Sequence, residues 1–117
     1  DNKFVGGGIP EAIWQLGNAT TMNLSKNNFS GSLTSSISKL TSISRLDLSD
    51  TGLNGYLPTE MGTITTLERL LLRGNSFSGT LPDTFSSLTS LVELDISWND
   101  VTGNVDFLCH IFHDTTR

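Results

Sequence analysis

The stretch LERLLLRGNSFSGTLP spans residues 67–82. Its apolar and turn-forming residues follow one another in the order Leu67, Leu70, Leu72, Asn75, Phe77, Gly79, Leu81 and Pro82. This spacing does not fit a helix, where apolar residues recur at steps of three and four along one face. It is also too long and too irregular for one alternating strand. Comparison with the rest of the chain is needed to find what sets this spacing.

The sequence repeats itself with a period of 24 residues. Equivalent apolar positions form columns at this interval: Leu16, Leu40, Ile64, Leu88 and Phe112; Met22, Leu46, Leu70 and Leu94; and Ile13, Ile37, Met61, Phe85 and Cys109. A glycine column contains Gly31, Gly55, Gly79 and Gly103. Self-similarity at a fixed period of roughly 20 to 50 residues is typical of a solenoid, whose stacked units share one core.

A chain of 117 residues suffices for a single modest core, so we interpret it as one solenoid domain. We also expect this domain to belong to a longer protein. The predicted boundaries are 1–15 for the second half of a truncated repeat, 16–39, 40–63 and 64–87 for full repeats, 88–111 for the last repeat running into a cap, and 112–117 for the start of that C-terminal cap. Each unit is too small to bury its own apolar face, so its stability depends on its neighbours.

Alternating apolar residues within each unit predict a short strand. Leu70 and Leu72 alternate with outward side chains, as a half-buried strand requires. We expect the strands of successive repeats to form a parallel sheet on the concave face. A polar column should point inward and bond backbone groups at the turn that follows: Asn27, Thr51, Asn75 and Asn99. Thr51 lacks an amide donor, so this ladder should be weaker there.

The repeat unit, LxxLxxLxLxxNxFxGxLPxxF, resembles the plant-type extracellular leucine-rich repeat. That repeat occurs in receptor-like kinases, receptor-like proteins and polygalacturonase-inhibiting proteins, with related repeats in algae. The resemblance implies a leucine-rich repeat solenoid of α/β-type repeats, with a parallel concave sheet and 3-10 or irregular segments on the convex side. It also implies non-catalytic recognition of a protein, peptide or cell-wall glycan, at an extracellular, secretory or cell-surface location.

Two other roles stay open at this point. The chain could be a structural or accessory subunit packed in a larger assembly, for example in an organelle lumen. It could also inhibit an enzyme, as polygalacturonase-inhibiting proteins do. Those inhibitors usually carry more repeats and paired cysteines in their caps, whereas this sequence has one cysteine.

The outward residues of the predicted strands form the candidate binding patch. It comprises Arg45, Asp47, Arg69, Leu71, Arg73, Glu93, Asp95 and Trp98. The 24-residue period places Arg45 beside Arg69, and Arg69 beside Glu93. Trp98 is of a residue type enriched in binding hot spots. The alternative is a solvated sheet whose charges pair with one another.

Three N-x-S/T sequences permit N-glycosylation if the chain passes through a secretory pathway. Their asparagines are Asn18, Asn23 and Asn28. The repeat template itself generates the strings at Asn23 and Asn28, so Asn18 is the most informative of the three. A glycan on Asn23 would lie on the concave face and block partners at that end.

Cys109 falls in an inward column, where a free cysteine behaves as a small buried hydrophobe. The resemblance offers a second interpretation, in which Cys109 is half of a capping disulfide with a partner beyond Arg117. The string CHIFHD at 109–114 does not favour a metal site, because zinc clusters normally draw ligands from two segments. The aspartates of the strands also lack the spacing of a compact calcium loop.

Composition and motifs exclude several classes of function. A net charge of −5 and a pI of about 4.7 argue against a nucleic-acid partner. No apolar run reaches the roughly 18–20 residues that a membrane span requires. The sequence contains no GxSxG, GxxxxGK[ST] or HExxH string. We therefore expect neither an enzyme nor a bound cofactor.

Overall fold

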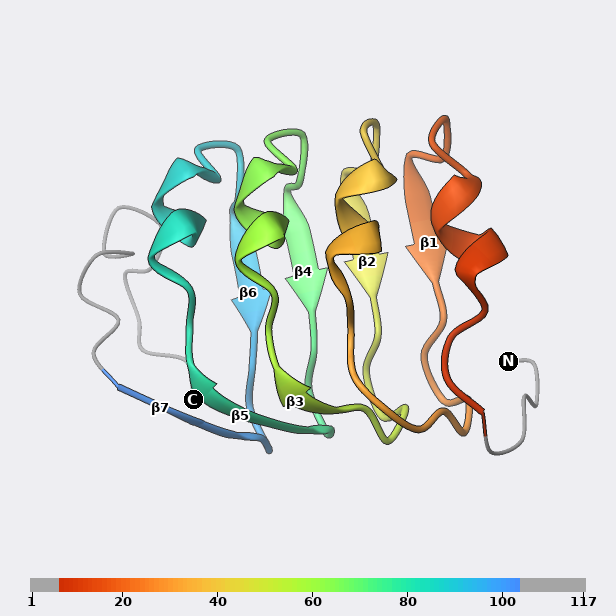
Figure 1. Cartoon of the computed structure of the whole chain (residues 1–117). Helices are drawn as coiled ribbons and strands as arrows, with labels where there is room; N and C mark the ends of the chain where they lie inside the picture. The colour runs from red at the N-terminus through yellow and green to blue at the C-terminus, as the bar shows by residue number, and fades with distance from the viewer. Residues whose placement is uncertain (1–6, 104–117) are drawn as a thin grey trace.

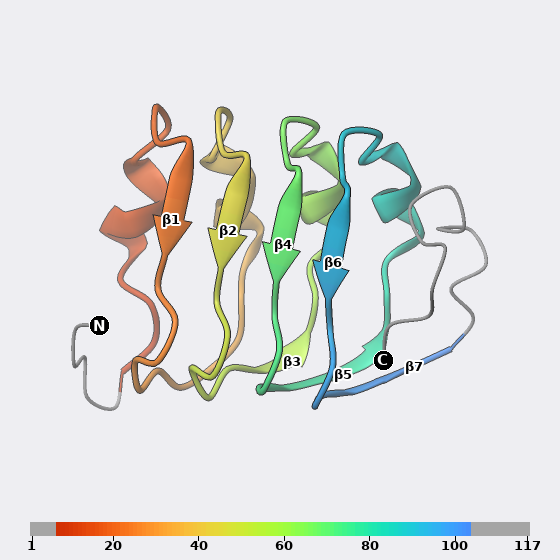
Figure 2. The same ribbon diagram turned by 180° about the vertical axis from the view of Figure 1, so that it is seen from behind.

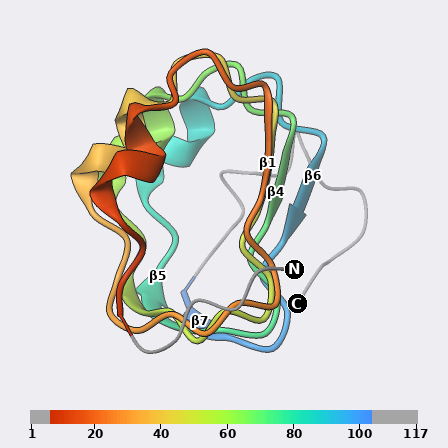
Figure 3. The same ribbon diagram turned by 90° about the vertical axis from the view of Figure 1, so that its right-hand side faces the viewer.

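The computed structural model describes residues 7–103. Its elements in chain order are η1 (Glu11–Gln15), β1 (Thr21–Asn23), η2 (Ser35–Lys39), β2 (Arg45–Asp47), β3 (Asn54–Tyr56), η3 (Thr59–Thr63), β4 (Arg69–Leu71), β5 (Ser76–Thr80), η4 (Asp83–Ser87), β6 (Glu93–Asp95) and β7 (Asp100–Thr102). Successive turns of the chain superimpose around a common interior when viewed along the stack (Figure 3). The repeat predicted from the sequence is therefore one turn of a solenoid.

The predicted parallel sheet is confirmed. It has four strands in the order β1-β2-β4-β6, which lie side by side in Figure 2. Each residue pairs with the residue 24 positions later, as Leu46 pairs with Leu70 and Leu70 with Leu94. The four 3-10 helices η1–η4 lie on the opposite side of the core (Figure 1). Two apolar columns, one from each side, thus meet in the interior.

A second parallel sheet, with the order β3-β5-β7, joins the concave and convex sides (Figure 1). In this segment the repeat predicted a column of glycines but no strand. The alternation of polar and apolar residues in Ser76-Phe77-Ser78 was the sequence signal for a strand. In the structure Phe77 is buried, whereas Ser76 is exposed and Ser78 is half-buried. Gly79 adopts a φ of 77°, and a Cβ there would lie 2.7 Å from Cδ1 of Tyr56. Glycine therefore permits both the backbone conformation and the close approach of the preceding turn.

Each 3-10 helix begins directly after an extended residue. Pro58 and Pro82 precede η3 and η4, with φ values of −70° and −61°. Proline fits there because its fixed φ suits the extended backbone and no sheet ladder needs its missing N–H. Thr34 precedes η2 instead, and its Oγ1 accepts a hydrogen bond from the N–H of Ser36 at 3.3 Å.

The apolar columns form one continuous core. Ile37, Met61 and Phe85 are fully buried in the column that the sequence also assigned to Ile13. Ile13 is only half-buried. Leu16, the first member of another apolar column, is 52% exposed. Both residues belong to the first described turn, where no earlier described turn covers them.

The asparagine ladder crosses between turns, and Asn75 is its best-connected member. Its Nδ2 donates to the carbonyl of Leu48, one turn earlier, at 2.8 Å, and to that of Leu72 at 3.0 Å. Its Oδ1 accepts from the N–H of Thr51 at 3.0 Å and from that of Leu53 at 3.2 Å. Asn99 repeats part of this pattern by accepting from the N–H of Phe77 at 3.0 Å.

Thr51 changes how the ladder is built. Nδ2 of Asn75 and of Asn99 each donates to a carbonyl one turn earlier, that of Leu48 and of Leu72. Thr51 has no amide and cannot donate in this way to the equivalent carbonyl of Leu24. Its backbone carbonyl accepts from the N–H of Phe29 at 2.8 Å, the role that Oδ1 of Asn75 has for Leu53 and Oδ1 of Asn99 has for Phe77. Gly52 follows with a φ of 85°, and a Cβ there would lie 2.8 Å from the carbonyl oxygen of Phe29. The Thr51-Gly52 pair therefore replaces one side-chain rung with a backbone rung.

Candidate functional site

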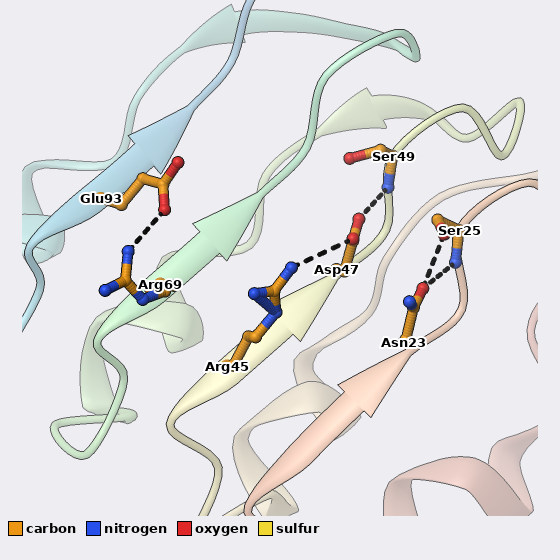
Figure 4. A network of polar contacts seen from close by, with 7 residues as sticks. All are labelled: Asn23, Ser25, Arg45, Asp47, Ser49, Arg69 and Glu93. Atoms are coloured by element: carbon orange, nitrogen blue, oxygen red, sulfur yellow. Dashed lines mark hydrogen bonds and ion pairs between the residues drawn. The ribbon is translucent and has the colours of Figure 1, made fainter.

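The charged residues of the concave sheet are placed by its register. Arg45 pairs with Arg69, and Arg69 pairs with Glu93, as the 24-residue period predicts. Nη1 of Arg69 lies 2.8 Å from Oε1 of Glu93 (Figure 4). Both side chains are nearly half exposed, so the ion pair contributes only about 0.2–1 kcal/mol. Arg69 is thus partly neutralised by its neighbour.

The row that includes Asp47 has a local structural role. Oδ1 of Asp47 accepts from the N–H of Ser49 at 3.0 Å, and Oδ1 of Asp95 does the same for Ser97. Oδ2 of Asp47 lies 3.7 Å from Nη2 of Arg45 (Figure 4). The sequence analysis placed Asp47 on the accessible patch, but its side chain is only 13% exposed. Both of its oxygens already have partners, which removes it from the accessible set.

Leu71 interrupts this polar row. In the sheet register it lies between Asp47 on β2 and Asp95 on β6. It was expected to be exposed and is half-buried. The concave surface therefore has an apolar contact point flanked by two oriented carboxylates.

Arg73 and Trp98 come together as predicted. Cζ of Arg73 lies 5.9 Å from the centroid of the Trp98 ring, within cation–π range. Nη1 of Arg73 also donates to Oγ of Ser97 at 3.0 Å. The predicted patch omitted Ser97, although the 24-residue period places it beside Arg73. Among residues 7–103, ion pairs within 4.0 Å join Arg45 to Asp47 and Arg69 to Glu93, and none includes Arg73.

Trp98 is held in a conformation that large side chains rarely adopt. Its φ is 59°, and the residue is 74% exposed. The equivalent residues of the other turns are also left-handed: Lys26, Asp50 and Gly74. A left-handed backbone costs an L-residue roughly 1–2 kcal/mol. The glycine in this column, Gly74, is a sequence signal for the left-handed conformation.

The remaining candidates are dispersed. Asn18 lies in the turn before β1, Asn23 ends β1, and Asn28 follows the next turn; all three are exposed. Cys109 and the predicted cap at 112–117 lie outside the described residues. Within residues 7–103, no three His, Cys, Asp or Glu side chains gather as metal ligands. No helix of this same part is long and apolar enough to cross a membrane.

Sequence comparison matches the Leucine Rich Repeat family model to residues 18–40 and 66–88. No curated protein matches the chain by sequence. Among solved structures, the leucine-rich repeat ectodomain of the plant membrane receptor kinase GASSHO1/SCHENGEN3 from Arabidopsis thaliana, in complex with CASPARIAN STRIP INTEGRITY FACTOR 2, is 36% identical with a TM-score of 0.83. The match covers 89% of this chain and 12% of that one.

Two further structures are similar. A chain of the BIR3–SERK2 complex from Arabidopsis thaliana is 34% identical with a TM-score of 0.86, over 95% of this chain and 60% of that one. The Arabidopsis receptor kinase HAESA, in complex with the peptide hormone IDA and the co-receptor SERK1, gives 32% identity and a TM-score of 0.78, over 84% of this chain and 16% of the matched chain. This chain thus spans less than two thirds of each. Its repeat, its two sheets and these similarities show that it is a plant-type leucine-rich repeat solenoid, similar to the ectodomains of plant receptor kinases.

Proposed function

We propose that the concave face binds a peptide, or an extended segment of a partner protein, without catalysing any reaction. The binding site is the cluster Leu71, Arg73, Ser97 and Trp98, called here the Trp98 cluster. The observation that carries this proposal is the exposed Trp98 beside Arg73, whose Cζ lies 5.9 Å from the centroid of the ring.

The chemistry of the Trp98 cluster suits recognition. Trp and Arg are the residue types most enriched in binding hot spots, and Leu71 adds apolar surface beside them. Arg73 has no carboxylate partner among residues 7–103, whereas Arg45 and Arg69 each have one. Ser97 and the Trp98 ring hold the guanidinium in place. Arg73 is therefore oriented to receive an anionic group of a ligand.

The named ligands of similar structures support this choice. The GASSHO1/SCHENGEN3 ectodomain was solved with CASPARIAN STRIP INTEGRITY FACTOR 2, and HAESA with the peptide hormone IDA. We infer that this chain likewise functions outside the cell, as part of a longer protein. The expected ligand carries an acidic group next to an apolar side chain, so that Arg73 and Trp98 are both engaged.

A peptide-display selection tests the proposal. A library of random linear peptides is selected on the immobilised chain, and the enriched peptides are titrated against Arg73→Ala and Lys39→Ala. Both variants remove one exposed cation, but Lys39 lies on η2, on the convex side. We expect Arg73→Ala to weaken binding at least tenfold, and Lys39→Ala to leave it unchanged. Equal binding by both variants would refute the assignment of the site.

A further inference from the structure

All three N-x-S/T sequences fall within the first full repeat, residues 16–39, and none occurs in residues 40–103. They occupy different segments of that repeat. Asn18 precedes β1, Asn23 ends it, and Asn28 lies beyond the following turn. Among the three, Asn23 alone belongs to a strand of the concave sheet. A modification there would affect the surface on which the proposed ligand binds.

The Asn23 amide is oriented with its nitrogen free. Its Oδ1 accepts from the N–H of Ser25 at 2.9 Å and from the hydroxyl of Ser25 at 2.6 Å (Figure 4). Its Nδ2 makes no hydrogen bond within residues 7–103. The ladder asparagines differ, because Nδ2 of Asn75 is committed to the carbonyls of Leu48 and Leu72. The fold can therefore accept a substituent on Nδ2 of Asn23 without losing a hydrogen bond.

We propose that Asn23 carries an N-linked glycan that shields the β1 end of the concave face. The co-reactant is a lipid-linked oligosaccharide pyrophosphate in the secretory lumen. Nδ2 bonds to the anomeric carbon of the sugar, the bond from that carbon to the pyrophosphate oxygen breaks, and Nδ2 loses one proton. The lipid pyrophosphate leaves. The product keeps Oδ1 and one N–H, so both bonds from Ser25 persist.

The attachment point on β1 lies at the other end of the concave sheet from β6. Asn23 is in register with Asp47 on β2, which is in register with Leu71 on β4. Neighbouring strands lie about 4.8 Å apart, so Leu71 is about 10 Å from the attachment point and β6 lies one strand further. The glycan is therefore rooted at the β1 end, whereas the Trp98 cluster lies toward β6. This inference rests on the secretory location and concave binding proposed above.

Occupancy is tested by producing the full chain through the secretory pathway of cultured insect cells and mapping glycopeptides by mass spectrometry. Ser25→Ala removes the acceptor sequence and keeps Asn23, while Ser25→Thr keeps both. Ser49→Ala makes the equivalent change on the neighbouring turn, outside any acceptor sequence. We expect a glycan on Asn23 in the wild type, in Ser25→Thr and in Ser49→Ala, and its loss in Ser25→Ala. A secreted wild-type chain with Asn23 bare overturns the proposal, whether or not Asn18 or Asn28 is modified.

Shielding is measured by the acylation rate of Lys26, three residues beyond Asn23, with Lys39 on η2 as the internal reference. We expect Lys26 to react more slowly in the glycosylated wild type than in Ser25→Ala, and Lys39 to react equally in both. Equal rates at Lys26 would show that the glycan does not cover this end.

Failure of this inference is separable from failure of the proposed function. Peptide display on bacterially produced chain, which lacks N-glycans, reports on Arg73 alone. Enrichment there together with a bare Asn23 overturns only the glycan. An occupied Asn23 with no Arg73-dependent enrichment overturns only the peptide site.

Discussion

Replacing individual ladder asparagines should have unequal effects, although the repeat makes them look equivalent. In Asn75→Ala, the buried N–H groups of Thr51 and Leu53 lose their acceptor. The carbonyls of Leu48 and Leu72 keep other donors, the hydroxyl of Thr51 and Nδ2 of Asn99. Two orphaned buried donors cost about 1–3 kcal/mol each, so the free energy of unfolding should fall by about 2–6 kcal/mol. A domain whose total stability is about 5–15 kcal/mol would lose much of it.

Asn27→Ala should cost far less. Among residues 7–103, Oδ1 of Asn27 is buried without a hydrogen-bond partner, so its removal orphans no donor in this part of the chain. Its Nδ2 donates to the carbonyl of Leu24 at 2.9 Å and reaches that of Ser25 at 3.4 Å. Losing one good bond and one unsatisfied oxygen together should cost about 1 kcal/mol or less.

The assay is urea denaturation of the purified chain, followed by far-ultraviolet circular dichroism and by the emission of buried Trp14. Asn75→Ala should lower the free energy of unfolding by at least about 2 kcal/mol more than Asn27→Ala, with similar m-values. Asn99→Ala should fall between them, because it orphans the N–H of Phe77. Equal losses in Asn75→Ala and Asn27→Ala would refute the reasoning that cross-turn acceptors stabilise the ladder.

Three other substitutions follow from the same geometry. Trp98→Gly should be about 1 kcal/mol more stable to urea than Trp98→Ala, because only glycine relieves the left-handed backbone; equal stability would remove the strain argument. Gly62→Ala should lower the free energy of unfolding by about 1–3 kcal/mol, since its Cβ would lie 2.5 Å from the backbone oxygen of Thr84. In the control Gly7→Ala the new Cβ meets nothing within 4 Å, so the stability should not change. Arg69→Ala should cost less than about 1 kcal/mol and less still in high salt, and a larger, salt-independent loss would contradict the exposed ion pair.

The solenoid and its register could be predicted because one period fixes both. A spacing of 24 residues places Arg45, Arg69 and Glu93 in one row without any knowledge of the coordinates. The burial of Asp47 could not be obtained this way, since strand alternation assigns a face but does not report local bonds. The period also does not predict that Asn23 is exposed whereas Leu71, in the same row, is half-buried.

The second sheet and the substituted ladder rung were missed for a related reason. The segment around Phe77 contains a glycine with positive φ, which is typical of a turn, and its strand pairing depends on stacked neighbours. At Thr51, the sequence indicates the loss of an amide but not the backbone rotation at Gly52 that compensates for it. Both features depend on contacts between turns, which a single repeat does not encode.

Collisional quenching of tryptophan emission tests the binding site most directly. Trp98 is 74% exposed, whereas Trp14 is 2% exposed, so quenching by acrylamide reports mainly on Trp98. Addition of a display-enriched peptide should protect the emission from quenching in the wild type and in Lys39→Ala, with at least tenfold more peptide needed in Arg73→Ala. Peptide binding that leaves the quenching of Trp98 unchanged would contradict the assignment of the concave site.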